Sequence, residues 1–167
     1  DGNTKVTLTN KTDTAADTLS VSVVEIIEDS DETDIDVLTA ANFETVNLES
    51  TKLAATTGSI INNIDSLAIA SATTLNITGN SELVIDGITG GAMTSLDASG
   101  LAAKLTATFS STDKVTATAA SKDTTFNFGS TLDNNDTVVG GASAKDVVTA
   151  TLSGATATTG ALNISGV

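Results

Sequence analysis

The chain lacks most of the side chains on which catalysis and cross-linking depend. Its 167 residues include no cysteine, proline, tryptophan, tyrosine, histidine or arginine, so lysine is the only basic side chain. Without cysteine, disulfides, thiolate catalysis and thiolate metal sites are excluded. Without histidine, a serine nucleophile has only lysine as a base, and no glycine-flanked serine elbow is present. Carboxylates without basic groups or aromatic sugar platforms do not make a glycosidase site either, so we expect a protein that is not an enzyme.

Positive charge is also scarce, because the chain has 7 basic residues and 21 acidic ones and therefore a net charge of −14. Such a chain is repelled by nucleic acid and by anionic membrane surfaces, and divalent cations are its natural counter-ions. Long hydrophobic runs are missing as well, and no segment has the pattern of a signal peptide. We therefore expect no nucleic-acid partner and no membrane insertion.

What the chain does contain is small and branched apolar residues. Hydrophobic residues make up 40 % of the sequence, but aromatic residues only 2 %. Such side chains pack best in thin layers, which suits a narrow coil of strands better than a broad globular core. The length fits one domain or two small ones.

The first 40 residues differ in pattern from the rest. Residues 5–9 and 18–23 alternate apolar and polar side chains, which predicts two strands joined by a polar loop. Residues 25–36 then carry seven acids, which predicts a solvated or metal-neutralised loop. We interpret residues 1–40 as an N-terminal β element with an acidic loop.

From residue 41 a repeat of short strand patterns takes over and continues to residue 167. The pattern centres are separated by roughly 8 to 15 residues, so two strands per coil would give a coil of about 20 residues. The predicted strands are residues 43–48, 64–69, 74–78, 82–86, 94–98, 104–109, 114–119, 124–128, 136–139, 146–152 and 161–164. Residues 36–42 and 99–104 are each long enough for only a single helical turn.

The phase of the apolar residues favours stacked coils. Ala107 and Ala117 occupy equivalent positions in consecutive strand patterns, and Thr106 and Thr116 lie on the opposite faces of those strands. Ladders of inward apolar residues and outward threonines follow from this phase. The sequence predicts an all-β fold, a β-solenoid of the parallel β-helix or β-roll type with an N-terminal strand pair. A β-sandwich of the same strands is the alternative.

Three short sequence segments resemble those of a known class of proteins. They are ANFETVNL at residues 41–48, MTSLDASGL at residues 93–101 and NNDTVVGGA at residues 134–142. They resemble the repeat regions of bacterial surface-layer (S-layer) and RTX-type exported proteins. The resemblance implies a β-solenoid on the bacterial cell surface that associates with copies of itself, with a cell-surface polysaccharide as a further candidate partner. Because the sequence opens at Asp1 without methionine and stops at Val167 within a strand pattern, we also expect the chain to be part of a longer protein.

RTX-type solenoids bind calcium through a glycine-rich nonapeptide with an aspartate ligand. GGASAKDV at residues 140–147 keeps the glycine pair and Asp146, but it lacks the third glycine, has one extra residue and places Lys145 beside the aspartate. The resemblance implies Asp146 as a calcium ligand, and a solvated aspartate at a degenerate corner is the alternative.

Two further groups of oxygen donors are candidate calcium ligands in their own right. The first is Glu28, Asp29, Asp31 and Asp34 in the acidic run, which lacks the glycine and final glutamate of an EF-hand and can instead be a solvated loop. The second is Asp133 and Asp136, for which an Asx turn is the alternative.

These observations predict a calcium-assisted structural segment of a bacterial cell-surface protein that assembles into a surface layer or scaffold. An adhesin segment that binds carbohydrate or a host surface is the alternative. The absence of tyrosine and tryptophan, the usual anchors of recognition surfaces, favours the first.

Overall fold

The structure, a computed structural model, describes residues 5–12, 14–25, 33–52, 61–111, 114–143, 145–151 and 162–167. Every regular element in these residues is a β-strand, which confirms the all-β prediction. Accordingly, the described part of the chain has no apolar helix of membrane-spanning length.

Within the described residues, fourteen strands form two parallel sheets of seven strands each. The odd sheet contains β1 (Lys5–Thr9), β3 (Thr33–Ala41), β5 (Ile61–Ala68), β7 (Glu82–Thr89), β9 (Leu105–Ser111), β11 (Thr124–Gly129) and β13 (Val147–Ala150). The even sheet contains β2 (Thr18–Glu25), β4 (Thr45–Lys52), β6 (Thr74–Gly79), β8 (Ser95–Leu101), β10 (Thr116–Thr118), β12 (Thr137–Val139) and β14 (Asn163–Ser165).

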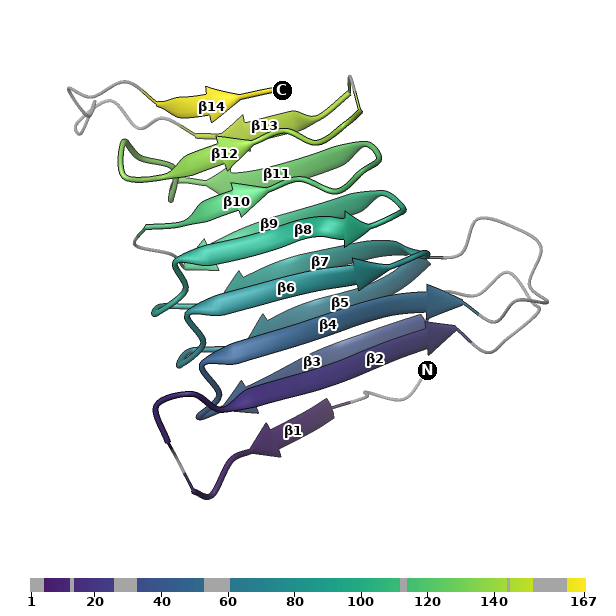
Figure 1. Cartoon of the computed structure of the whole chain (residues 1–167), viewed down its shortest axis with the longest axis vertical. Helices are drawn as coiled ribbons and strands as arrows, with labels where there is room; N and C mark the ends of the chain where they lie inside the picture. The colour runs from purple at the N-terminus through teal and green to yellow at the C-terminus, as the bar shows by residue number, and fades with distance from the viewer. Residues whose placement is uncertain are drawn as a thin grey trace.

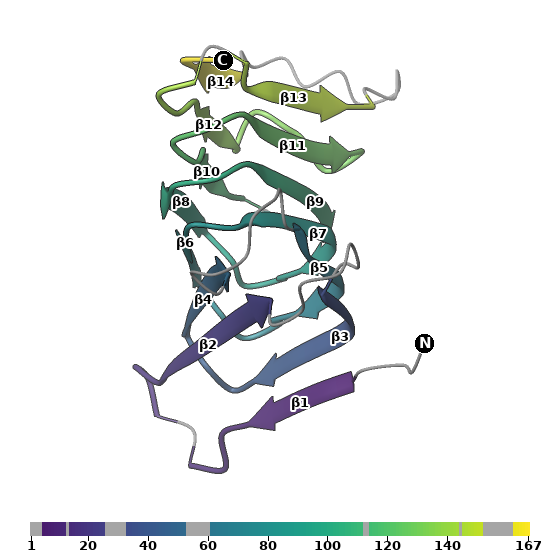
Figure 2. The same ribbon diagram turned by 90° about the vertical axis from the view of Figure 1, so that its right-hand side faces the viewer.

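The chain changes sheet after every strand, so one odd and one even strand make each coil (Figures 1 and 2). Equivalent positions in the middle of the molecule are 21 residues apart, as at Thr73 and Thr94 or Val115 and Asp136. The interval is 29 residues between β4 and β6, where residues 53–60 lie between the strands. Two parallel sheets wound in this way are consistent with the predicted β-solenoid, and the coil length agrees with the sequence.

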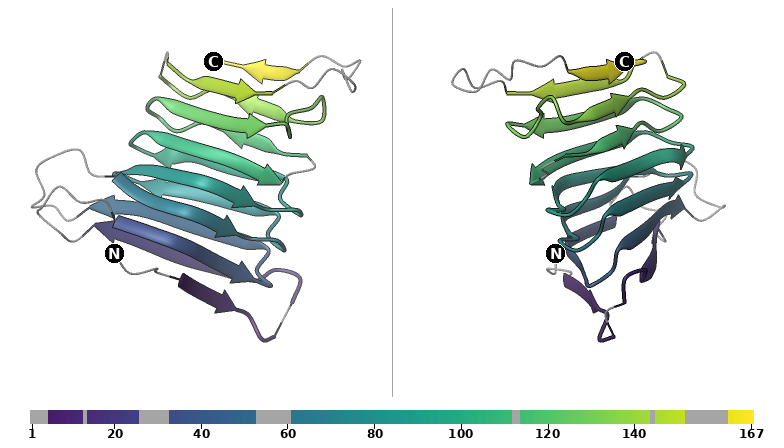
Figure 3. Two further views of the ribbon diagram at one scale, coloured as in Figure 1. Left: turned by 180° about the vertical axis from the view of Figure 1, so that it is seen from behind. Right: turned by 60° about the vertical axis from the view of Figure 1, so that its left-hand side comes forward.

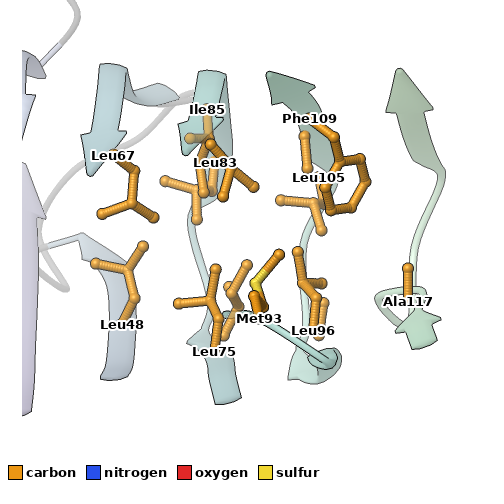
Figure 4. Packing of buried hydrophobic residues seen from close by; sticks show 14 of the residues in the cluster. Leu48, Leu67, Leu75, Leu83, Ile85, Met93, Leu96, Leu105, Phe109 and Ala117 are labelled. Atoms are coloured by element: carbon orange, nitrogen blue, oxygen red, sulfur yellow. The ribbon is translucent and has the colours of Figure 1, made fainter. Parts of the chain in front are cut away.

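The core lies between the two sheets and consists of apolar ladders (Figure 4). In the odd sheet Ile64, Ile85, Ala107 and Phe126 are in register, and all four are buried. In the even sheet the ladder runs through Leu19, Val46, Leu75, Leu96, Ala117, Val138 and Ile164. Thr106 is only partly buried and Thr116 is exposed, so the predicted inward and outward faces are confirmed.

Side-chain volume is balanced across the core toward the C-terminal end. The odd sheet contributes three phenylalanines, of which Phe109 and Phe128 stack with 4.4 Å between their ring centroids, while Phe126 is tilted against Phe109 at 6.1 Å. The even sheet contributes buried alanines, among them Ala98 and Ala117. Large residues on one sheet and small ones on the other keep the thin core filled.

The N-terminal segment differs from the prediction in two respects. β1 and β2 occupy the predicted positions, but they pair with β3 and β4 respectively and lie in different sheets. Residues 36–42, considered as a helical turn, belong mostly to strand β3, which covers β1 with Leu38 and Ala40. Likewise residues 99–101 extend strand β8. Strand pairing buries these apolar side chains, which an isolated helical turn cannot do.

Candidate metal centre

The dipeptide Ile-Asp occurs on three consecutive strands of the odd sheet. Ile35 of β3 pairs with Ile64 of β5, which pairs with Ile85 of β7. Asp36, Asp65 and Asp86 follow these isoleucines directly. Ile64 and Ile85 are buried and Ile35 is partly buried. Because successive side chains of a strand point to opposite faces, these inward isoleucines place the three aspartates on the outer face.

The carboxylates of Asp34, Asp36 and Asp65 come together on this face. Their ligand oxygens lie within 4.8 Å of one another, and Asp34 and Asp65 are exposed. Asn63 lies between them and donates from Nδ2 to Oδ1 of Asp34 at 3.3 Å and to Oδ1 of Asp65 at 3.0 Å. We call Asp34, Asp36, Asp65 and Asn63 the aspartate cluster.

Electrostatics in the aspartate cluster oppose ionisation. Desolvation raises the pKa of Asp34 above its ordinary value, and the neighbouring carboxylates of Asp65, Asp36 and Asp86 raise it further, against the hydrogen bond from Asn63. Like charges so close favour either a proton or a cation between them. Carboxylate oxygens are the donors that Ca²⁺ prefers.

A buried oxygen beside the carboxylates supports the fit of a hard cation. Oδ1 of Asn63 is buried and has no hydrogen-bond partner among the described residues. The oxygen and nitrogen of an amide exchange places by a half-turn of the side chain. That rotation would turn Oδ1 toward the carboxylates at the cost of the two hydrogen bonds that Nδ2 donates to Asp34 and Asp65, so the oxygen could replace the amide donor only with a cation bound between the carboxylates.

Of the predicted ligands in the acidic run, Asp34 belongs to the aspartate cluster. Glu28, Asp29 and Asp31 lie outside the described residues.

Asp136 is buried and braces the backbone between coils. Its Oδ1 accepts a hydrogen bond from the Val115 N–H, and its Oδ2 accepts one from the Asp133 N–H, both at 2.9 Å. Burial raises the pKa of Asp136 even though these two bonds lower it. Asp133 accepts hydrogen bonds from the backbone and side chain of Asn135, which is the Asx turn considered above.

Asp146 has the same geometry one strand further along. Its Oδ1 accepts the Thr124 N–H at 2.9 Å and its Oδ2 accepts the Gly141 N–H at 2.6 Å. Asp136 and Asp146 therefore hold the start of a strand in the preceding coil, and we place the candidate calcium site at the aspartate cluster instead.

Sequence reasoning missed Asp36 and Asp65 as members of one site with Asp34. The signal that finds them is the recurrence of Ile-Asp at residues 35, 64 and 85, because these intervals equal the lengths of the two coils that separate them.

Comparisons of this chain with protein-family models, with curated proteins and with solved structures give no match.

Proposed function

We propose that this chain is a structural segment of a secreted bacterial cell-surface protein, which associates with copies of itself and is stabilised by calcium. The observation that carries the proposal is the pair of apolar ladders that run through the stacked coils, beneath outer faces of small polar residues. Such a stack is a stiff spacer, because each coil is held by its two neighbours. The missing histidine, arginine and cysteine leave this chain few means of catalysis.

Calcium acts in this proposal at the aspartate cluster. The three carboxylates lie on two neighbouring strands, so a shared cation would tie the second coil to the third while it relieves their repulsion. Weak calcium sites with dissociation constants of about 10⁻⁴–10⁻³ M are typical of extracellular modules. An exposed cluster with three carboxylates suits that range and that location.

Thermal unfolding with calcium, with chelator and with sodium at matched ionic strength tests this proposal. At a hundred times its dissociation constant, calcium adds about 2.7 kcal/mol to the free energy of unfolding. For a chain of this length that is a rise in melting temperature of roughly 5–10 °C. Sodium should give a smaller shift, because it only screens the repulsion.

The matched variants are Asp65→Asn and Asp97→Asn. Asp97 lies on the outer face of the even sheet, in register with the uncharged Asn76 and Thr118, so its replacement changes the same charge without touching the cluster. We expect Asp65→Asn to abolish the calcium-specific shift and Asp97→Asn to retain it. A shift that sodium reproduces in full, or that both variants keep, contradicts calcium binding at this cluster.

A further inference from the structure

The two sheets of the stack have different outer faces. The even sheet faces the viewer in Figure 1, and the odd sheet does so in the left view of Figure 3. Strands β1, β3, β5 and β7 of the odd sheet carry six charged residues: Lys5, Asp34, Asp36, Asp65, Glu82 and Asp86. A molecule that covered this face would have to desolvate those charges, which is costly.

The outer side of the even sheet consists mainly of short uncharged side chains. They form two columns in strand register across β2, β4, β6, β8 and β10. The first column is Thr18, Thr45, Thr74, Ser95 and Thr116, and the second is Ser20, Asn47, Asn76, Asp97 and Thr118. None of these ten residues is buried. We call them the even face.

The even face holds few charges. Asp97 is one of its ten residues, and Glu49 of β4 lies on the same side of the sheet, where its carboxylate accepts a hydrogen bond from the Ser22 hydroxyl. Depletion of charged residues is what marks the core of a non-obligate interface. In a molecule with a net charge of −14, the even face is therefore a side on which contact with another molecule requires little desolvation of charge.

Asn76 lies in the middle of the even face, within a ladder of polar side chains. Its Nδ2 donates to Oδ1 of Asn47 at 2.8 Å, and Nδ2 of Asn47 donates to the Ser20 hydroxyl at 3.4 Å. An amide has two N–H donors and one carbonyl oxygen, so Asn76 retains an N–H and its Oδ1 for a partner. Asparagine ladders of this kind pack well against identical ladders of a second sheet.

We propose that two molecules of this chain pack face to face through their even faces, about a two-fold axis that runs along β6 and sets Asn76 against Asn76. This rests on the self-association in the proposed function and specifies its surface. The axis reverses the direction of the stack, so β4 faces β8 and Asp97 meets the amide of Asn47. An axis along the stack that also paired the two Asn76 side chains would instead set Asp97 against Asp97.

The charges at the start of the strands fit this arrangement. Asp17 and Glu44 directly precede β2 and β4, whereas Lys114 lies just before β10. Because β2 faces β10, the axis brings the two acids of one copy to the same end of the interface as the lysine of the other. Opposite charges at the rim of an interface steer association. Asp113, beside Lys114, lies outside the described residues.

The rim at the other end of the strands is mixed in sign. Glu25 and Lys52 end β2 and β4 and pair with each other in register, and they come opposite Lys104, Lys122 and Asp123 of the second copy. This rim therefore does not set charges of one sign alone against each other. Residues 26–32, which follow β2, lie outside the described residues.

The area of the even face suits a weak dimer. Five strands spaced about 4.8 Å apart, with about six residues each at about 3.3 Å per residue, cover about 500 Å² on each copy. The total of about 1,000 Å² is the lower limit for a specific interface. Both copies use the same patch, so the contact closes as a dimer and does not extend into a filament.

Sedimentation velocity over a range of protein concentration, in chelator, tests the contact. The wild-type protein should dimerise. Asn76→Asp sets two carboxylates against each other on the axis and should raise the dissociation constant on the order of tenfold or more. Thr74→Lys sets two lysines against each other at the neighbouring position and should act in the same direction. The two variants change the net charge in opposite directions, so a general charge effect cannot explain a loss in both.

The matched control is Asn127→Asp. Asn127 lies on the outer face of the odd sheet and donates from Nδ2 to the Thr108 hydroxyl at 3.3 Å, so the replacement makes the same change of charge in a similar setting on the other side of the molecule. It should dimerise like the wild type. Circular dichroism and melting of all three variants check that each is folded.

Two results would overturn the contact. Association that is unchanged in both even-face variants, or that only Asn127→Asp removes, places the contact elsewhere and leaves self-association standing. A wild-type protein that is monomeric at every concentration overturns both, and glycan binding that Asn76→Asp removes would then assign the even face to a carbohydrate. The calcium measurement is independent of each of these results.

Discussion

At the scale of single residues, Gly79 is a position where the fold excludes every side chain. It ends β6 with a φ of 122°, and a Cβ there would collide with the backbone carbonyl of Ser50 in the preceding coil. Left-handed backbone and close contact between coils coincide at this corner. Gly91 gives the opposite case, since a Cβ would meet nothing within 4 Å.

We expect Gly79→Ala to lower the free energy of unfolding by about 2–5 kcal/mol. Of this, about 1–2 kcal/mol comes from the positive φ and about 1–3 kcal/mol from overpacking. Gly91→Ala should be neutral or should stabilise by up to about 1 kcal/mol, because it restricts the unfolded chain. Urea unfolding of both variants checks the contrast, and equal losses would contradict the close approach of the two coils.

At the scale of strands, alternation was enough to predict most of the fold. β6, β9 and β11 lie where strict period-two patterns placed them, and their inward residues are buried. β3 was missed because Ile35 and Leu38 are both inward although they are three residues apart. Such a spacing is typical of a helix, and here it arises because two consecutive residues, Asp36 and Val37, lie between the inward ones.

Irregular spacing is also the reason why most of the aspartate cluster could not be predicted from the sequence. Phe43 and Ile64 each begin the same six-residue pattern of apolar, acidic and hydroxyl residues, but Phe43 precedes β4 of the other sheet, and the partners of Ile64 in register are Ile35 and Ile85. The coils are of unequal length at this point, so no fixed period aligns the three strands. Asp34 was recognised from the local density of acids alone, but its neighbours Asp36 and Asp65 depend on strand register, which comes from long-range pairing.

Removing one charge from the aspartate cluster should have opposite effects with and without calcium. The pKa of Asp34 is raised above 3.8 in the folded state, so above that pH the folded protein binds more protons than the unfolded one. The contribution of Asp34 to stability is therefore lost as the pH rises through its folded pKa. Without calcium, Asp34→Asn should stabilise the protein at neutral pH by roughly 0.2–1 kcal/mol, the size of a surface charge pair.

The stabilisation by Asp34→Asn is tested by measuring melting temperatures in chelator, from neutral pH down to the ordinary pKa of aspartate. The melting temperature of the wild type should approach that of Asp34→Asn as the pH falls. Asp17, Asp123 and Asp136 titrate in both proteins, so the comparison cancels their contributions. With saturating calcium at neutral pH the order should reverse, with the wild type more stable. A variant less stable than the wild type in chelator at every pH would contradict the repulsion.

At the scale of the whole molecule, the fold is a row of coils in which each coil packs mainly on the next on either side, although Asn62 of β5 in the third coil also donates from Nδ2 to the carbonyl of Val23 in β2 of the first. Stability in such a row is a sum of coil and interface terms, so a coil with one neighbour is held less firmly than a coil with two. Ile64, Ile85 and Leu96 in the middle of the ladders are completely buried, whereas Leu19 at one end is partly buried and Ile164 at the other is exposed. Unfolding should therefore begin at the ends.

Native-state hydrogen exchange measures this gradient at backbone hydrogen bonds between consecutive coils. The amides of Thr73, Thr94, Thr116 and Thr137 each donate to a carbonyl of the preceding coil at 2.9 Å, so differences in their exchange report coil stability and not bond length. At low protein concentration, protection should be greatest at Thr94 and lower at Thr137, with Gly140 lowest because its acceptor Ser165 belongs to the last strand. Equal protection at all these amides would mean that the molecule unfolds as one unit. That result would contradict a stability that is the sum of similar contributions from the individual coils.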